Sequence, residues 1–161
     1  MIKKFINRIT IALMLVFSTA SLAGEQSNAM SYNMAMKAME AAEAYARQQD
    51  WNVTVLVTDQ NAEPVMLHRM DGAPVRSIGY ANSKALVVTQ TSLTSGDYAT
   101  KLKAGEIEEV EGGVTYKGGV PVFLDGKLLG AVTVSGVKDY QDEEVAIAGT
   151  RAIASYLVKN R

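Results

Sequence analysis

The chain contains a single histidine, His68, and no cysteine. An imidazole nitrogen is the commonest protein ligand for metal ions, which makes His68 the candidate metal ligand of this sequence. A partly exposed strand histidine that binds nothing is the competing interpretation, and it is the commoner case. The absence of cysteine from the sequence excludes thiolate metal sites, cysteine nucleophiles and a disulfide framework.

Two cations, Arg69 and Lys84, are candidate groups for binding a carboxylate. An arginine pairs with a carboxylate through two parallel N–H···O bonds, whereas a lysine binds it as a point charge. The alternative is a structural ion pair with Asp59 or Asp71. The sequence alone leaves the ligand role and the structural role equally open.

A third group of candidates lies in the stretch Thr-Tyr-Lys-Gly-Gly-Val-Pro, residues 115–121. Gly118 and Gly119 lack a side chain, so a flat ligand could approach the backbone there. Tyr116 adds a phenolic oxygen, which can ligate iron. We therefore expect Thr115, Tyr116, Gly118, Gly119 and Pro121 to line a ligand site, with ordinary strand packing as the alternative.

Four glutamates, Glu106, Glu108, Glu109 and Glu111, form an acidic cluster. On a helix, Glu106 and Glu109 would share one side and could hold a hard cation. A solvated charged segment is the commoner meaning of such a run.

A mixed set of helices and strands must position these candidates. The clearest element is a β-hairpin, because two apolar runs flank Asp125-Gly126-Lys127 and Asp-Gly is a strong turn signal. Helical spacing and strand alternation predict helices over residues 30–49, 75–89, 98–103 and 142–159, and strands over 51–59, 64–70, 114–116, 120–124 and 128–134. This order predicts an α+β domain with a central, mainly antiparallel sheet flanked by helices.

Residues 1–23 have the pattern of a secretory signal peptide. Basic residues precede an apolar run from Ile9 to Phe17, and Ser21-Leu22-Ala23 is a typical cleavage site. The run is shorter than the roughly 20 residues that a membrane-spanning helix needs. We therefore expect cleavage after Ala23 and a periplasmic or secreted mature chain, residues 24–161, that forms one domain without a membrane span.

Removal of the signal peptide changes the charge balance. Lys3, Lys4 and Arg8 are three of the 16 basic residues, and none of the 17 acidic residues lies in this segment. The 13 basic residues that remain give the mature chain a net charge of −4. Nucleic acids and anionic membrane surfaces bind basic faces, so neither is expected as a partner.

Six motifs occur in order along the chain. They are Val53 to Asp59 after an alanine-rich helix, Arg69 to Ala73, Ala81 to Ala85, Gly118 to Pro121, Gly130 to Gly136, and Asp142-Glu143. In this order and spacing they resemble the GlcG/HbpS family, also called the haem-degrading-domain family. The resemblance covers nearly all of the mature chain, roughly from Asn33 to Ala154.

The resemblance implies a profilin-like domain with α/β/α layers and a five-stranded antiparallel sheet, which assembles into homo-oligomers. It also implies binding of haem or a related tetrapyrrole. Arg69 and Lys84 would then pair with ligand carboxylates, and Tyr116 or His68 would be the iron ligand. The resemblance itself does not support His68, which lies just before the motif that begins at Arg69.

Three functions follow as hypotheses. The first is an exported, non-catalytic protein that binds or responds to haem and works as a homo-oligomer. The second is an enzyme that degrades haem or acts on a small hydroxy acid such as glycolate, with Arg69 and Lys84 binding the carboxylate. The third is a structural accessory protein that binds no ligand and uses its glycines only for packing in an oligomer.

Overall fold

A computed structural model describes residues 29–160, which form four helices and four strands. In chain order these are α1 (Tyr32–Gln48), β1 (Thr54–Asp59), β2 (Pro64–Arg69), α2 (Ser77–Thr91), α3 (Ser95–Ala104), β3 (Gly119–Leu124), β4 (Lys127–Ser135) and α4 (Asp139–Lys159). The predicted signal peptide lies outside the described residues, and its cleavage stays a prediction. No helix within residues 29–160 combines the length and the hydropathy needed to cross a membrane.

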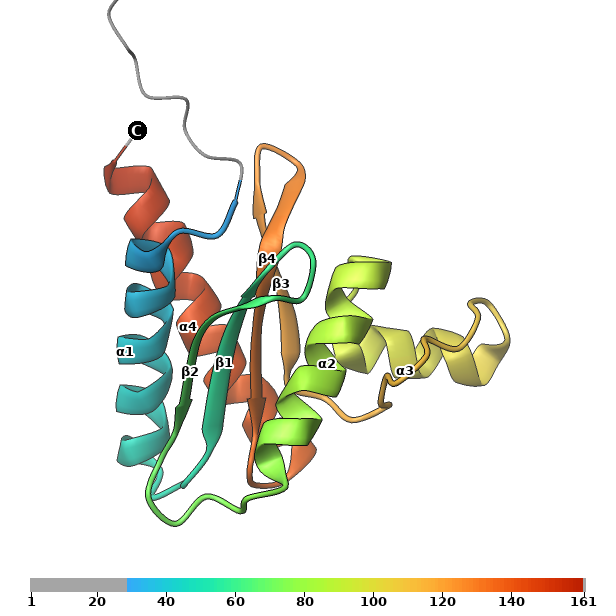
Figure 1. The fold of residues 1–161 in the computed structure, drawn as a ribbon, viewed down its shortest axis with the longest axis horizontal. Helices are drawn as coiled ribbons and strands as arrows, with labels where there is room; N and C mark the ends of the chain where they lie inside the picture. Colours follow the sequence, from blue (N-terminus) through green and yellow to red (C-terminus); the bar gives the residue numbers. More distant parts are fainter. Residues whose placement is uncertain (1–28, 161) are drawn as a thin grey trace, which may run out of the picture.

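The four strands form one antiparallel sheet in the order β2-β1-β4-β3 (Figure 1). β1 and β4 are the central strands, and β2 and β3 are the two edges. The α+β prediction is confirmed, but the prediction of five strands is wrong, because residues 114–116 form no strand. The connection before them packs instead on the helices: Val110 lies against Val87 and Tyr98, and the Val110 N–H donates a 2.9 Å hydrogen bond to the Tyr98 hydroxyl.

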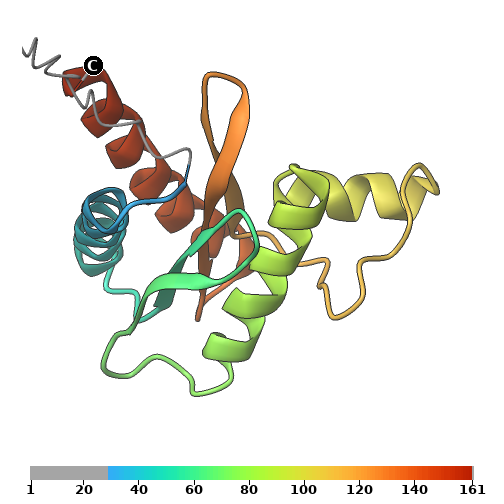
Figure 2. The same cartoon turned by 45° about the horizontal axis from the view of Figure 1, so that its top comes forward.

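Helices cover both faces of the sheet. α1 and α4 lie side by side on one face, α2 lies on the other, and α3 projects away from the sheet beyond α2 (Figures 1 and 2). Val55 and Val57 of β1, together with Val53 just before the strand, lie in the main apolar core beneath α1 and α4. Alanines on the inner side of α1, such as Ala38 and Ala42, are fully buried there. Their small side chains let the helix approach the sheet closely.

Helix α1 begins at Tyr32, two residues after the predicted start at residue 30, and Ser31 is its N-cap. The Ser31 side-chain hydroxyl accepts a 3.2 Å hydrogen bond from the Met34 N–H, which satisfies one of the free donors in the first turn of the helix.

The predicted hairpin is also confirmed. β3 ends at Leu124 and β4 begins at Lys127, and the two turn residues, Asp125 and Gly126, have positive φ angles of 49° and 77°. Two consecutive positive φ angles are typical of the turn that joins tightly paired strands. Gly130 has a different role, because a Cβ at this position would overlap the carbonyl oxygen of Thr58 on the neighbouring strand.

Candidate functional site

One pocket has a volume of about 600 Å³, which is within the range typical of small-molecule sites. It lies where the N-terminal half of α2 meets the end of β4, the first turn of α4 and the segment that carries Tyr116. We call it the tyrosine pocket. Its lining residues are Pro74, Arg76, Ser77, Tyr80, Lys84, Tyr116, Ser135, Gly136, Val137, Lys138, Asp139, Tyr140 and Asp142.

A buried ion pair forms the floor of the tyrosine pocket. Lys84 Nζ lies 2.9 Å from Asp142 Oδ2 and donates a second hydrogen bond, 2.7 Å long, to the Val134 carbonyl oxygen. The side chains of Lys84 and Asp142 are only 1% and 4% exposed. Asp142 also accepts a 3.1 Å hydrogen bond from the Val137 N–H. The pair therefore joins α2, the last residues of β4 and the first turn of α4 at one point.

Burial shifts the pKa of both groups toward their neutral forms. It lowers the pKa of Lys84 from the ordinary 10.5, and the charge and hydrogen bond of Asp142 oppose this shift. It raises the pKa of Asp142 from the ordinary 3.8, and Lys84 opposes that shift. Desolvation thus outweighs the mutual attraction for each group, as expected for a buried ion pair.

Gly118 is the residue that lets the chain lie directly on this ion pair. Its φ is +111°, and a Cβ there would lie 2.7 Å from the Asp142 Cβ and 2.9 Å from Lys84 Nζ. Gly119 is equally confined, because its Cβ would lie 2.8 Å from a Val88 methyl group. These glycines allow a close approach to the backbone, but what lies against them is the protein itself.

Aromatic rings form the wall of the tyrosine pocket. Tyr80 and Tyr116 make an edge-to-face contact with ring centroids 5.8 Å apart and an interplanar angle of 87°. They are 38% and 52% exposed, and Tyr140 on α4 is 48% exposed. Three phenol groups therefore remain open to solvent around a concave surface.

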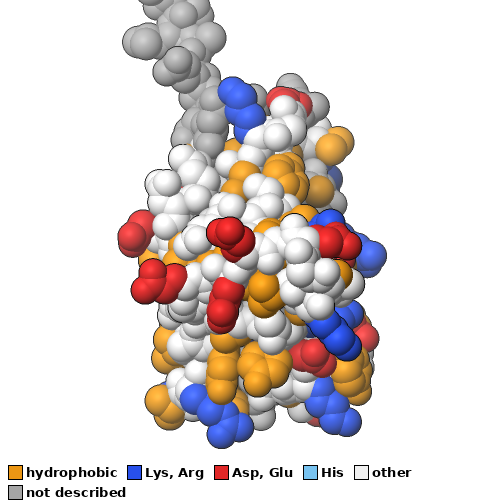
Figure 3. Space-filling view, turned by 90° about the vertical axis from the view of Figure 1, so that its right-hand side faces the viewer, with side chains coloured by type: hydrophobic (Ala, Val, Ile, Leu, Met, Phe, Trp, Pro, Cys, Tyr) orange, Lys and Arg blue, Asp and Glu red, His pale blue; other side chains and the backbone are white. Residues whose placement is uncertain are grey.

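Charged side chains stand at the rim of the same pocket. Arg76 and Lys138 are exposed cations, and Asp139 is the exposed acid beside them. Figure 3 shows the side of the molecule that carries α2 and α3, where hydrophobic side chains gather in the lower part with Lys and Arg side chains beside them. A ligand with a flat apolar body and acidic substituents fits such a surface.

The structure divides the predicted site residues between two edges of the sheet. Lys84 and Tyr116 line the tyrosine pocket, and Gly118 touches its floor. Thr115 is exposed beside Tyr116, and Gly119 is buried, with its N–H bonded at 2.9 Å to the Ser95 hydroxyl. Pro121 is half-buried on β3, paired with Ala131 of β4, and is not part of the pocket lining.

His68 and Arg69 lie on β2, at the opposite edge of the sheet from β3. They line a smaller hollow of about 280 Å³ together with Arg47, Asn52, Met70 and Asp71. The His68 side chain is 56% exposed, and its Nδ1 bonds to Glu43 Oε1. Arg69 donates a 3.1 Å hydrogen bond to the Ala73 carbonyl oxygen. Neither residue shares the tyrosine pocket with Lys84 and Tyr116.

Lys84 forms a structural ion pair, but the predicted partners, Asp59 and Asp71, are wrong. The partner is Asp142, in place of Asp59 or Asp71, and Asp59 uses its carboxylate to accept hydrogen bonds from the Asn61 and Glu63 N–H groups. One sequence signal could have indicated the pair. Lys84 falls on the apolar side of its predicted helix, and a lysine in that place requires a buried acid.

Sequence reasoning also did not find Arg76, Lys138 and Tyr140 as pocket residues. They follow turns and belong to no motif, so they are recognised as pocket residues only in the structure, where the start of α2 and the start of α4 line the same pocket.

The acidic cluster is solvated: Glu106, Glu108, Glu109 and Glu111 are exposed, and Glu106 pairs with Lys101 at 3.1 Å. Within residues 29–160 no group of three or more His, Asp or Glu side chains is placed to hold a metal ion.

Comparison with known proteins gives consistent matches over most of this chain. Residues 30–151 match the family described as "Haem degrading protein HbpS-like". Protein GlcG of Escherichia coli (strain K12) is 29% identical over 108 residues, which are 66% of this chain and 81% of GlcG.

Two crystal structures extend the match to three dimensions. A double mutant of HbpS from Streptomyces reticuli is 29% identical with a TM-score of 0.72, covering 78% of this chain and 88% of that one. The structure of PduOC in complex with haem is 25% identical with a TM-score of 0.71, covering 77% and 94%. The resemblance found in the sequence motifs is confirmed, and this chain belongs to the HbpS-like family.

Proposed function

We propose that this protein binds haem in the tyrosine pocket and acts as an exported haem-binding or haem-responsive protein. The observation that carries the proposal is a concave surface of about 600 Å³ with three exposed tyrosines at its wall and two cations at its rim. Membership of the HbpS-like family and the haem complex of the PduOC relative support it.

Each part of the tyrosine pocket suits one part of a haem molecule. The rings of Tyr80, Tyr116 and Tyr140 offer apolar area for the flat macrocycle, and a phenol oxygen is an established ligand type for haem iron. Arg76 and Lys138 suit the two propionates, because both are exposed and carry no ion pair with a described acidic side chain.

We assign Lys84 a role different from carboxylate binding. Its ammonium group already bonds to Asp142 and to the Val134 carbonyl oxygen, and its side chain is 1% exposed. Pairing with a ligand would require breaking this buried pair, which is costly. Lys84 instead holds the start of α4 against α2, and so keeps Tyr140 and Lys138 facing Tyr80 and Arg76.

A hemin titration tests the proposal. We expect a saturable change in the Soret band at micromolar hemin with one haem per chain. Replacing both rim cations, Arg76→Gln with Lys138→Gln, should weaken binding about 3- to 30-fold, because two exposed charge pairs each contribute up to about 1 kcal/mol. The matched control, Arg69→Gln with Lys127→Gln, removes two cations outside the tyrosine pocket and should leave the affinity unchanged. No saturable change with the wild type, or equal losses in both double variants, would overturn the assignment.

Haem degradation is the second candidate function, and the family description favours it. Incubation of the haem-loaded protein with a reductant and oxygen distinguishes binding from degradation. We expect the Soret band to persist. Its loss with release of a bilin would establish the enzyme.

Export and self-assembly complete the proposal. The sequence of residues 1–23 supports export, and intact-mass measurement on secreted protein should give a chain that begins at Gly24.

Two open sheet edges and exposed apolar side chains, including Leu67 at 40% and Phe123 at 46%, support assembly between copies. Light scattering should give a mass at least twice that of the mature chain, and a monomer at micromolar concentration would contradict this part.

A further inference from the structure

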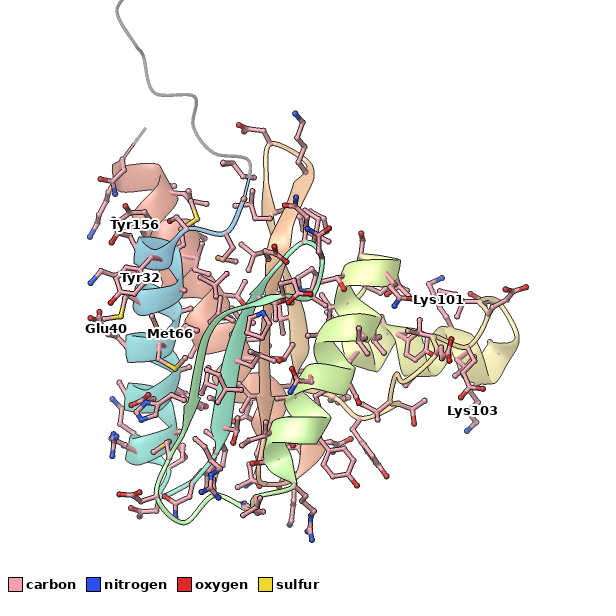
Figure 4. All side chains as sticks on the ribbon, in the orientation of Figure 1. Tyr32, Glu40, Met66, Lys101, Lys103 and Tyr156 are labelled. Carbon is pink, nitrogen blue, oxygen red and sulfur yellow. The ribbon has the colours of Figure 1, made fainter. Side chains whose placement is uncertain are left out.

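A third hollow, of about 310 Å³, lies between α1 and β2, on the opposite face of the sheet from α2. Three of the eight methionines of the chain line it together with its only histidine: Met36, Met39, Met66 and His68. We call it the Met–His groove. In Figure 4, Met66 of β2 lies against α1, near the labelled Glu40.

The regular geometry of the two elements brings these four side chains together. Met36 and Met39 are three residues apart on α1 and therefore share one side of the helix. Met66 and His68 are two residues apart on β2 and therefore point to the same face of the sheet. Their strand partners are Val57 and Val55, which belong to the core beneath α1.

A carboxylate fixes the orientation of the imidazole. Glu43 on α1 lines the same groove and bonds to His68 through Nδ1, so the second ring nitrogen, Nε2, is the one left to bind a ligand. No described residue makes a hydrogen bond to Nε2. A carboxylate on one nitrogen of a histidine whose other nitrogen binds a metal is a recurring arrangement.

The donors in the groove that are not already engaged are soft. Glu40 pairs with Lys37 at 2.8 Å, and Glu43 pairs with Arg47 at 3.3 Å and with His68. Three thioether sulfurs and one imidazole nitrogen remain. Thioethers favour Cu(I) over hard cations such as Mg²⁺ or Ca²⁺, which bind through oxygen ligands.

We propose that the Met–His groove binds one Cu(I) ion, with Met36, Met39, Met66 and His68 as ligands. The site is separate from the tyrosine pocket, and it stands whether or not the protein binds haem. Binding involves no change of oxidation state, and neutral thioethers and a neutral imidazole need lose no proton to Cu(I).

An anaerobic competition with bicinchoninate measures this binding directly. The purified protein should remove one Cu(I) per chain from the coloured bicinchoninate complex. Met66→Leu should weaken binding at least about 10-fold, and Glu43→Gln, which loosens the imidazole, should weaken it about 10-fold. The triple variant Met36→Leu, Met39→Leu, Met66→Leu should remove it. The matched controls are Met34→Leu and Met70→Leu, which change buried methionines outside the groove at little cost in stability.

Methionine methyl NMR spectra provide a second readout that does not depend on affinity. Addition of Cu(I) should shift the methyl signals of Met36, Met39 and Met66 and leave those of Met34 and Met70 in place. The proposal fails if copper stays with bicinchoninate, if Met34→Leu weakens binding as much as Met66→Leu, or if the shifted signals belong to other methionines.

Discussion

The face of the sheet beneath α1 and α4 is packed with valine, alanine, leucine and isoleucine side chains, whereas the face beneath α2 buries polar ones. On the α2 side, Thr54 bonds to Ser77 at 2.7 Å and Thr133 donates a 2.9 Å bond to the Ala81 carbonyl oxygen. The apolar cluster there is small.

This contrast indicates that the two faces of the sheet have different roles within one domain. The α1/α4 face supplies most of the buried apolar area, which is the main source of folding free energy. The α2 face uses hydrogen bonds and one ion pair to set the positions of the elements that form the tyrosine pocket. Substitutions on the two faces should therefore have different consequences.

The largest effect is expected from Lys84→Met. The change leaves Asp142 buried without its cation, and loss of one member of a buried pair typically costs about 3–5 kcal/mol. Urea unfolding measures the loss. The double variant Lys84→Met, Asp142→Leu is the control, since it removes both charges and should be near or above the wild type in stability. If Lys84→Met lowers the free energy of unfolding by less than about 1 kcal/mol, Lys84 and Asp142 do not form a buried, coupled ion pair.

Ile153→Ala should cost about 2–5 kcal/mol in unfolding free energy, because Ile153 is fully buried in the α1/α4 core. Hemin affinity of the folded variant should be unchanged, since the residue lies on the other face from the tyrosine pocket. Urea unfolding and the Soret titration on the same sample check both statements. A variant that stays stable but loses haem would break the division between the faces.

The pH dependence of the Lys84–Asp142 pair sharpens the comparison. The raised pKa of Asp142 means that the folded chain binds more protons than the unfolded chain in mild acid, so the cost of the buried carboxylate disappears as the pH falls toward 3.8. The lowered pKa of Lys84 means that the unfolded chain binds more protons in alkali, so stability rises as the pH approaches 10.5.

Wild type should consequently be least stable, relative to the Lys84→Met, Asp142→Leu variant, at pH values between the two shifted pKa values. At those pH values the unfolding free energy of the wild type should be about 1–4 kcal/mol below that of the double variant, and this difference should shrink at lower and at higher pH. Urea unfolding of both chains across this pH range gives the difference. A difference that is constant with pH would contradict the assigned pKa directions.

Ser95→Ala is expected to have the smallest effect, about 1–3 kcal/mol, because it leaves the buried N–H of Gly119 without its acceptor. The loss should be visible in urea unfolding and in faster hydrogen exchange at Gly119. The exposed Thr100→Ala serves as the control, and an equal loss there would remove the special role of Ser95.

Much of the fold could be predicted from the sequence, because the elements have local signals. Asp125-Gly126 marks the hairpin, Ser31 caps α1, and six motifs in order indicate the family. The fifth strand at residues 114–116 was wrong, since three residues carry too little pattern to separate a strand from a connection, and the connection before them packs on the helices through Val110.

The site was predictable only in part. Lys84 and Tyr116 stood out by type and motif, and both line the tyrosine pocket. Asp142 could not be matched to Lys84, because 58 residues separate them and only the fold brings the first turn of α4 to Lys84 beside the end of β4. His68 precedes a family motif and Arg69 begins it, but both lie on β2, the edge strand opposite β3, so their place in the motif order did not show that they lie outside the tyrosine pocket.

The measurement that tests the account most directly is the hemin Soret titration of Tyr116→Phe beside His68→Ala. The two residues are the candidate iron ligands, and they lie at opposite sides of the sheet. The account predicts that Tyr116→Phe weakens binding and alters the haem spectrum, while His68→Ala leaves both unchanged. Loss of haem binding in His68→Ala with a normal Tyr116→Phe variant would contradict it and move the haem site to the β2 edge.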